Sequence, residues 1–336
     1  MRVAEVATLA TPVSRLGSGS IEAIVWHLTK GLVDRGHQVT VFGAAGSTPH
    51  GELVATLPDT YGADGSPQDW QVCEWENVAQ AVAQSGRFDV VHSHGYLWGL
   101  PLEPLSRAPM VHTLHVLPYE DSRRLVHLHS GATITAVSHF QWREFPDVEP
   151  AAVIHHGVDP VDFTFRAEPE DYVCYLGRFL PVKGVLAAVD AARGMGLPIV
   201  LAGPRDDFFD EEVAPLVDGY GVRYAGAVTG PERDVLLGGA RALLYPISLP
   251  EPFGLVLPEA MMCGTPVVAT TVGAVPELVD DGVTGALVED TSCIGDGVSR
   301  ALALDRAVVR ARAVERFHVD RMVDGYLRVF EQVSGA

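Results

Sequence analysis

Positive charge is scarce in this sequence. Lysine and arginine together number 24 against 43 aspartates and glutamates, the formal net charge is −19, and lysine occurs only at Lys30 and Lys183. Nucleic acids and anionic membranes attract proteins through clustered basic side chains. The charge balance therefore argues against either as a partner, and it draws attention to the two lysines.

Long apolar runs are also missing. None approaches the roughly 20 residues of a transmembrane helix, and Arg2 and Glu5 interrupt the N-terminal segment where a signal peptide would have its hydrophobic region. The four cysteines lack the spacing of a metal site, since they are far apart at Cys73, Cys174, Cys263 and Cys293. We therefore expect no stable membrane insertion, buried thiols and a cytoplasmic location.

The 336 residues do contain an alternation of strand and helix patterns. Residues 3–9 read as an apolar strand, residues 21–35 carry apolar side chains at helical spacing, and residues 38–42 read as a second strand. The pattern begins again with a predicted strand over 172–176 and a predicted helix over 185–193. This alternation is typical of doubly wound α/β folds, and the length suggests roughly two such domains.

Residues 251–264 carry two carboxylates, Glu251 and Glu259, around an uncharged segment. Pro258 suits the first position of a helix, and a helix N-terminus beside a sheet favours an anion such as phosphate. Two glutamates at the same place must then face hydrogen-bond donors, for which sugar hydroxyls are the obvious candidates. The alternative is that Glu259 only complements the helix dipole and Glu251 is a solvated loop acid.

Two cations lie in one predicted strand-to-helix loop of the second half, at Arg178 and Lys183. A planar bidentate donor and a point charge together suit the oxygens of a diphosphate. The alternative is a pair of surface cations. With the two glutamates, the set matches a nucleoside-diphosphate sugar, which presents a diphosphate, a ribose diol and a hexose polyol.

In the first half, the candidate residues follow predicted strands. His94 and His115 come after strands over 88–92 and 110–114, and ligands of open α/β sheets gather at the carboxyl ends of strands. With 13 histidines in the chain, a structural role remains the alternative. Gly17 and Gly19 lie in the loop after the first strand, where a ligand would approach the backbone, although such a loop is also a common flexible turn.

Residues 57–75 are rich in turn-forming residues and carry three aromatic side chains, Tyr61, Trp70 and Trp75. We expect an insertion over the N-terminal sheet. Its aromatic side chains either pack locally or line an acceptor site.

Several short motifs, taken in order, carry a resemblance to a known family. The chain resembles a retaining GT-B glycosyltransferase of family 4 (glycosyl transferases group 1) over nearly its whole length. The matching segments are 19–22, 34–40, 89–94, 113–115, 157–159, 177–178, 183–184, 251–254, 259–260, 264–268, 273–279 and 282–285.

The resemblance implies an α/β fold of two Rossmann-like, doubly wound parallel-sheet domains facing a cleft. It implies an acceptor-binding domain over 1–160, a nucleotide-sugar-binding domain over 161–315, and a C-terminal helix over 316–336 that crosses back to the first domain. Both the fold and these boundaries are expectations of the family likeness.

The resemblance also implies roles for residues of the second half. Arg178 and Lys183 would bind the donor diphosphate and stabilise it as it leaves. Glu251 would hold donor sugar hydroxyls and Glu259 the ribose hydroxyls. Backbone amides beside Glu251 would assist, from Phe253, Gly254 and Leu255.

In the first half, the resemblance places His115 by the donor sugar C6 and the reacting centre, and residues 17–20 on the phosphates. His94 and Tyr96 are candidates for the acceptor side. The sequence departs from the family pattern at three positions, which are Ser20 for a glycine, Val182 for an acid and His156 for an asparagine.

The chemistry that follows needs no cofactor beyond the donor substrate and no metal, because Arg178, Lys183 and a helix dipole would stabilise the leaving diphosphate. We assign no covalent nucleophile. The family's frequencies favour UDP as the donor nucleotide, with GDP next. The acidic charge favours a soluble small-molecule or glycan acceptor over a bilayer lipid.

Two alternatives remain open. One is another GT-B enzyme, a nucleotide-sugar epimerase or a phosphorylase, and the other is a sugar-binding protein without catalysis. A nicotinamide dehydrogenase is disfavoured because no Gly-x-Gly-x-x-Gly follows the first predicted strand.

Overall fold

The computed structural model describes residues 1–15, 17, 19–61, 63, 67, 69–143 and 147–335. The chain divides into two compact units. Unit 1 comprises Met1–Gly157 and Val319–Ala336, and unit 2 comprises Val158–His318. The sequence placed these divisions after residues 160 and 315. Each unit is described by itself.

Unit 1 is built on a parallel sheet, for which the described residues give seven strands in the order β3-β2-β1-β4-β5-β6-β7. Sequence order runs outward in both directions from the β1–β4 pair, which makes the sheet doubly wound. The strands are β1 (Arg2–Val6), β2 (Gln38–Ala44), β3 (Glu52–Leu57), β4 (Val90–Ser93), β5 (Met110–Thr113), β6 (Thr133–Ala136) and β7 (Ala152–Val153).

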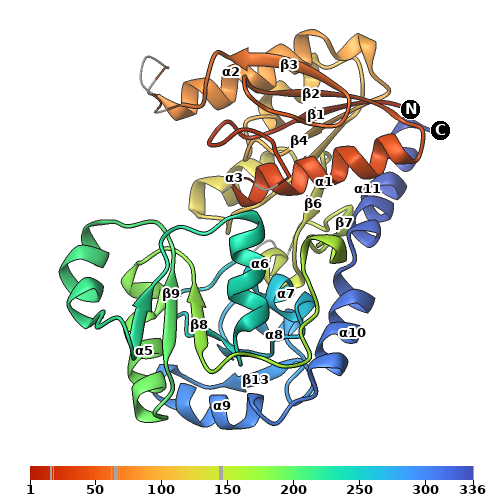
Figure 1. The fold of residues 1–336 in the computed structure, drawn as a ribbon. Coiled ribbons are helices and arrows are strands. Elements are labelled where there is room, and N and C mark those ends of the chain that lie inside the picture. The colour runs from red at the N-terminus through yellow and green to blue at the C-terminus, as the bar shows by residue number, and fades with distance from the viewer. Residues whose placement is uncertain are drawn as a thin grey trace. The chain divides into compact units, whose positions relative to one another are not determined.

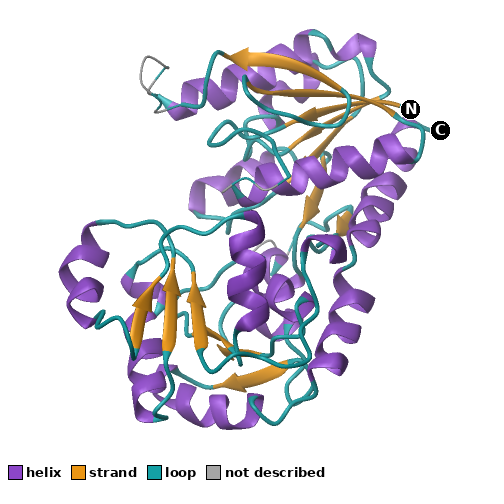
Figure 2. Ribbon diagram, in the orientation of Figure 1, coloured by secondary structure: helices purple, strands orange, loops and turns teal. Residues whose placement is uncertain are grey.

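Helices flank the unit 1 sheet (Figure 2). On one face, apolar side chains of α2 form a core cluster with β1, which includes Ala4, Val6, Val78 and Ala81. Because side chains alternate along a strand, Glu5 of β1 faces the other side. The helices of unit 1 are α1 (Ser20–Asp34), α2 (Trp70–Ala83), α3 (Glu120–Leu128), α4 (His139–Trp142) and α11 (Val319–Ser334).

Unit 2 repeats this architecture. Its described strands form a six-stranded parallel sheet in the order β10-β9-β8-β11-β12-β13. The strands are β8 (Val173–Leu176), β9 (Ile199–Ala202), β10 (Val222–Tyr224), β11 (Leu243–Tyr245), β12 (Val267–Thr270) and β13 (Gly285–Val288). The helices are α5 (Val185–Gly194), α6 (Gly230–Gly239), α7 (Val256–Met262), α8 (Val275–Leu278), α9 (Ile294–Ala301) and α10 (Arg306–Phe317).

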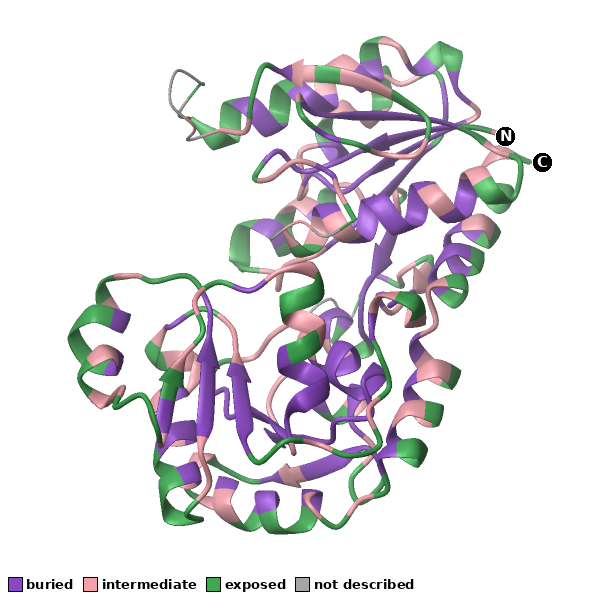
Figure 3. Ribbon diagram, in the orientation of Figure 1, coloured by how far each residue is buried: buried purple, intermediate pink, exposed green. Residues whose placement is uncertain are grey.

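The strands of both sheets are largely buried (Figure 3). In unit 2, α5 and α9 contribute Val189 and Val298 to a core cluster that also contains Val173 and Leu244 of the sheet. Parallel sheets covered on both faces need apolar side chains in both directions along each strand. This requirement explains the near-continuous apolar runs that the sequence shows at the strands.

The last helix, α11, belongs to unit 1 although it follows unit 2 in the sequence. It lies beside α1 (Figure 1), where Gly31 of α1 leaves room for Val323 of α11. Its aromatic side chains Tyr326 and Phe330 pack on His92 of β4, with ring centroids 4.7 and 5.2 Å away. Helix α11 therefore covers the sheet face toward which Glu5 points.

Three sequence predictions differ from the structure. Trp70 and Trp75 belong to helix α2, which Asp69 caps by accepting from two backbone N–H groups, so the expected turn-rich insertion does not extend to residue 75. Parts of the 57–75 stretch lie outside the described residues. Helix α7 begins at Val256 rather than at Pro258.

Of the cysteines expected to be buried, Cys293 is only half-buried. None of the described helices has both the length and the apolar character needed to cross a membrane.

Candidate functional site

Each sheet has one point at which the strand order reverses, between β1 and β4 in unit 1 and between β8 and β11 in unit 2. The loops that leave neighbouring strands at such a point diverge to opposite faces and leave a crevice at the carboxyl ends, where ligands of doubly wound folds bind. The sequence-predicted site residues follow these strands.

In unit 2, the loops after β8 and β11 bring Lys183 and Glu251 together as an ion pair. The hydroxyl of Tyr245, at the end of β11, donates a hydrogen bond to the other oxygen of Glu251. The two loops are also joined through the backbone, because the Ser248 N–H donates to the Val182 carbonyl at 2.9 Å. The lysine expected to bind the diphosphate and the glutamate expected to bind the sugar are thus in direct contact.

The backbone of Glu251 is fixed by the loop after β12. The Ala274 N–H donates to the Glu251 carbonyl at 3.1 Å. Gly273 has a φ of +67°, and a Cβ there would lie 2.6 Å from the Glu251 nitrogen. A larger residue at 273 would therefore push the Glu251 backbone away.

Arg178 is exposed in the loop after β8, with its carbonyl accepting a hydrogen bond from the Tyr175 hydroxyl at 2.8 Å. Its charge acts on Lys183: burial, and then the Arg178 guanidinium, lower the pKa of Lys183 to about 8. Arg178 and Lys183 therefore form one cationic group.

Glu259 has a partner that the sequence did not suggest. Its side chain, 7% exposed in the first turns of α7, accepts from Arg233 Nη1 of α6 at 2.9 Å. Burial raises the pKa of Glu259, while the nearby guanidinium lowers it. The Arg233 Nε is buried without a hydrogen-bond partner. Glu259 and Arg233 thus form a buried pair at the edge where the ribose was expected.

The residues between the glutamates shape the loop that enters α7. Gly254 has a φ of +110° and leaves room for the Tyr245 hydroxyl, 3.1 Å from where its Cβ would be. Phe253 is buried and its ring lies 6.4 Å from that of Phe317. Leu255 is the residue before the helix, and no side chain caps that end. The predicted roles of their backbone amides remain predictions.

In unit 1, Gly19 precedes α1 and Ser20 is its exposed first residue. Gly19 has a local reason to be glycine, because a Cβ there would collide with the carboxyl of Glu22 and the hydroxyl of Thr11. Gly17 is half-buried. Ser18, within the predicted phosphate loop, lies outside the described residues.

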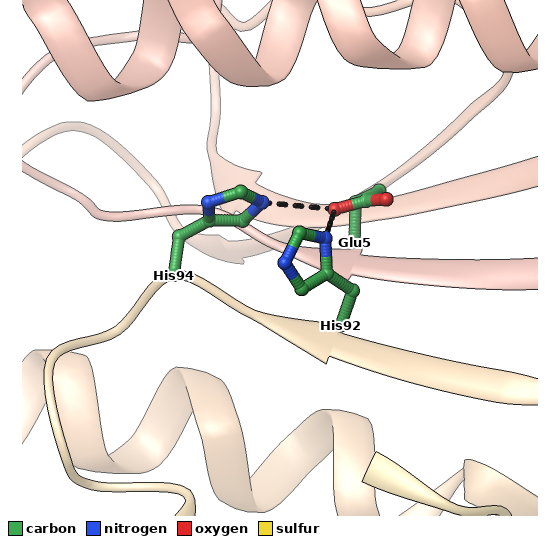
Figure 4. Close-up of side chains that lie close together, drawn as sticks. All are labelled: Glu5, His92 and His94. Carbon is green, nitrogen blue, oxygen red and sulfur yellow. Dashed lines mark hydrogen bonds and ion pairs between the residues drawn. The ribbon is translucent and has the colours of Figure 1, made fainter. Parts of the chain in front are cut away.

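His94 and His115 are connected side chains. His94 Nδ1 is 2.9 Å from His115 Nε2, and His94 Nε2 is 3.0 Å from Glu5 Oε2. The same oxygen lies 2.8 Å from His92 Nδ1 (Figure 4). The three residues Glu5, His92 and His94 are almost completely buried, and His115 is half-buried at the end of β5.

Burial also sets the charge of these rings. It is the largest cause that lowers the pKa of His92 to about 3 and of His94 to about 4, and it lowers the pKa of His115 as well. The imidazoles are therefore neutral near pH 7, and each carries one N–H donor and one acceptor nitrogen. His115 was predicted from its position, whereas Glu5 was not.

The atoms of Glu5, His92 and His94 are also near enough to one another to be compared with a metal site, since they lie within 4.8 Å. His94 Nε2, however, already forms a hydrogen bond to Glu5 Oε2 at 3.0 Å, and His92 Nδ1 lies 2.8 Å from the same oxygen as an ion-pair contact. The three side chains thus contact one another directly, while Glu5 Oε1 has no hydrogen-bond partner among the described residues.

Tyr96 follows β4 with a φ of +50°, an uncommon conformation for a residue with a side chain. Its ring centroid is 5.4 Å from that of Trp70, which is 39% exposed. Trp70 is also 6.5 Å from Trp98. The predicted acceptor-side candidate therefore belongs to an aromatic cluster with a partly exposed face.

Comparison with known proteins agrees with this architecture. The family described as Glycosyltransferase Family 4 matches residues 21–162, and the family described as Glycosyl transferases group 1 matches residues 162–310. A D-inositol 3-phosphate glycosyltransferase of Mycobacterium avium is 30% identical, over 85% of this chain and 81% of that protein.

Solved structures are similar over the full chain. AviGT4, a glycosyltransferase involved in avilamycin A biosynthesis, has a TM-score of 0.77 at 25% identity, covering 100% of this chain and 98% of its own. HepE of Anabaena, in complex with UDP and glucose, has a TM-score of 0.74 at 20% identity, covering 99% and 100%.

Two Rossmann-like, doubly wound units are the building blocks of the GT-B fold, and the expected fold class is confirmed. The chain belongs to the family 4, group 1 glycosyltransferases.

Proposed function

We propose that this glycosyltransferase moves a hexosyl unit from a UDP-sugar, bound by unit 2, to a hydroxyl of a small acceptor, with retention of the anomeric configuration. The observation that carries the proposal is the grouping of Lys183, Glu251 and Arg178 at the switch point of the unit 2 sheet. The UDP and glucose in the similarly folded HepE support the choice of donor.

The ion pair between Lys183 and Glu251 suggests how the donor is received. A diphosphate offers Lys183 a more highly charged partner than one carboxylate, and Arg178 adds a second cation to the same anion. Glu251 loses the lysine but keeps the Tyr245 hydroxyl, and its freed oxygen accepts from sugar hydroxyls. As the glycosidic bond breaks, the two cations stabilise the negative charge that develops on the leaving UDP.

The acceptor hydroxyl attacks from the face that the diphosphate leaves, with a diphosphate oxygen accepting its proton. This route conserves the anomeric configuration and needs no covalent intermediate. The cations Arg178 and Lys183 perform the charge stabilisation that a bound divalent ion would otherwise supply. We therefore propose a metal-independent reaction.

The donor and stereochemistry are tested by incubating the protein with UDP-glucose and a panel of polyols, then identifying the product's anomeric configuration by NMR. We expect UDP release that depends on acceptor, an α-linked product from the α-linked donor, and the same rate after EDTA treatment. A β-linked product would exclude retention, and loss of activity with EDTA would exclude metal independence. Conversion of the donor without acceptor would favour an epimerase, dependence on inorganic phosphate a phosphorylase, and binding without product a sugar-binding protein.

Unit 1 suggests the acceptor class. Glu74 is fully buried beside the loop after β1, with one oxygen accepting from the Leu9 N–H at 2.8 Å and the other without a partner. Glu22, 3% exposed, accepts from the Thr8 hydroxyl at 2.8 Å. Burial is the main cause that raises the pKa of Glu74 to about 8, and the Glu22 charge adds to it. The unpartnered Glu74 oxygen is a buried acceptor that a polyol hydroxyl can satisfy, whereas a phosphate ionised near neutral pH offers it no donor.

We therefore expect a polyol without phosphate as acceptor, unlike the substrate in the name of the mycobacterial relatives. In a competition assay with UDP-glucose, myo-inositol and glucosamine should be glycosylated in preference to D-inositol 3-phosphate. A kcat/KM for the phosphate ester equal to or above that of the unphosphorylated polyols would contradict this expectation.

A further inference from the structure

The buried chain from Glu5 through His94 to His115 is the feature that the reaction described so far does not use. It begins in the middle of β1, crosses to the carboxyl end of β4, and ends at the carboxyl end of β5. Figure 4 shows the first link, in which the rings of His92 and His94 both direct a nitrogen at one oxygen of Glu5.

The direction in which the hydrogen bonds of this series donate depends on whether Glu5 is ionised. Two imidazole nitrogens converge on Glu5 Oε2, and the other carboxyl oxygen has no partner. Burial raises the pKa of Glu5, while the hydrogen bond from His94 lowers it. An ionised oxygen accepts from His94 Nε2 in a charge-assisted hydrogen bond and also faces His92 Nδ1 at 2.8 Å, whereas a protonated oxygen could donate to only one of the two rings. The second ring nitrogen of His92 lies 2.7 Å from the Thr113 hydroxyl, which can donate to it.

One tautomer follows for each ring along the chain. If His94 donates from Nε2 to Glu5, its Nδ1 carries no hydrogen and must accept from His115. His115 then donates from Nε2, and its Nδ1 is left with a lone pair. That Nδ1 is buried and has no hydrogen-bond partner among the residues that the structure describes, a costly state that a ligand hydroxyl would relieve.

The position of His115 is otherwise fixed. Its ring stacks on that of His94, with centroids 5.1 Å apart and planes 27° apart, and on that of His156 at 5.3 Å and 13°. The ring is thus held between two others and cannot easily flip to exchange its nitrogens. With the ring fixed, the remaining question is which of its two nitrogens carries the hydrogen.

We propose that Glu5 is a positioning residue that acts through His94 to keep His115 protonated on Nε2, so that His115 Nδ1 accepts a hydrogen bond from a substrate hydroxyl. The part that concerns substrate rests on the proposed function. The assignment of the proton does not, because it concerns the ligand-free protein.

The proton assignment is tested by long-range ¹H–¹⁵N NMR of the full-length protein with ¹⁵N-labelled histidine, using His115→Gln to identify the signals. We expect a pyridine-like shift for His115 Nδ1 and a pyrrole-like shift for Nε2. The opposite pattern, or a doubly protonated ring, overturns the proposal.

Two variants then locate the cause. Glu5→Gln removes the charge that selects the tautomers, so the His115 Nδ1 signal should move toward the pyrrole-like position. Glu103→Gln is the matched control, because Glu103 pairs with His112 Nε2 at 3.3 Å and is not part of the Glu5–His94–His115 hydrogen-bond series. It should leave the His115 signals unchanged. An unchanged His115 in a folded Glu5→Gln protein removes Glu5 from the role. Should Glu5→Gln fail to fold, the wild-type tautomer still decides the outcome.

The substrate arm compares UDP-glucose with analogues that each lack one sugar hydroxyl. In the wild type, one analogue should lose about ten- to a hundredfold in kcat/KM, the scale of an unsatisfied buried acceptor, and Glu5→Gln should reduce that discrimination. Equal use of every analogue, or discrimination unchanged in Glu5→Gln, overturns the hydroxyl contact. Absence of any sugar transfer would contradict the proposed function instead. The NMR assignment of the His115 proton does not depend on that activity.

Discussion

Replacing Arg178 with alanine is expected to lower kcat by about 10²–10³-fold, the scale measured when one preorganised donor to a developing anion is removed. The Arg178 side chain is exposed, and its charge acts on the neighbouring Lys183. The folded protein should therefore remain stable while UDP loses an anchor. The measurement is the initial rate of transfer, together with the rise in Tm that saturating UDP produces.

The matched control is Arg193→Ala, which removes another exposed arginine of unit 2, at the end of α5, whose guanidinium contacts the Leu216 carbonyl at 3.1 Å. It should alter neither the rate nor the UDP-dependent rise in Tm. Full stabilisation by UDP in Arg178→Ala would refute the assignment of Arg178 to the diphosphate.

Arg233→Ala is expected to destabilise unit 2 by about 3–5 kcal/mol near neutral pH, the cost of leaving one member of a buried ion pair alone. Glu259 would keep its carboxylate in a site where only 7% of its side chain is exposed. The sign of the pH dependence follows from the pKa. Burial raises the folded-state pKa of Glu259 above the unfolded value of 4.5, so the folded chain binds the proton more tightly and stability falls as pH rises.

Losing Arg233 removes the group that lowers this pKa, so the stability deficit of Arg233→Ala should be small at about pH 5 and grow toward about pH 8. Urea unfolding at both values measures it. Arg205→Ala serves as the control, because it breaks an exposed pair with Asp210 and should cost less than about 1 kcal/mol at either pH. A deficit of equal size at both pH values would show that Arg233 stabilises by packing alone.

Much of the fold was predictable because the local signals agree with the long-range arrangement. Apolar residues at helical spacing over 21–35 predict α1, which the structure places at Ser20–Asp34. The helix predicted over 185–193 corresponds to α5, Val185–Gly194. The stretch over 57–75 misled because its turn residues and aromatics hid a helix start at Asp69, whose cap signal the buried Val78 and Val82 would have supported.

The candidate site was predictable only where its residues lie in loops with a known direction. Arg178 and Lys183 share one loop, and strand ends place them at the carboxyl edge. The partners Arg233 and Glu5 were missed because each reaches its contact across the fold. Tyr245 was missed because it was interpreted only as the end of a strand, although it lies six positions before Glu251. Glu5 left one usable signal: a charge inside a buried parallel strand must have a partner. The sequence cannot name that partner, since His94 is 89 positions away.

Helix α11 imposes an order on the maturation of this protein. A ribosome delivers the whole of unit 2 before it has delivered Val319–Ser334, so the nascent chain carries a unit 1 whose sheet is still open at His92. During translation, domains usually fold in order, with the N-terminal domain first. Here the first unit to be synthesised is the last that can close, so its apolar face stays uncovered until α11 has been made.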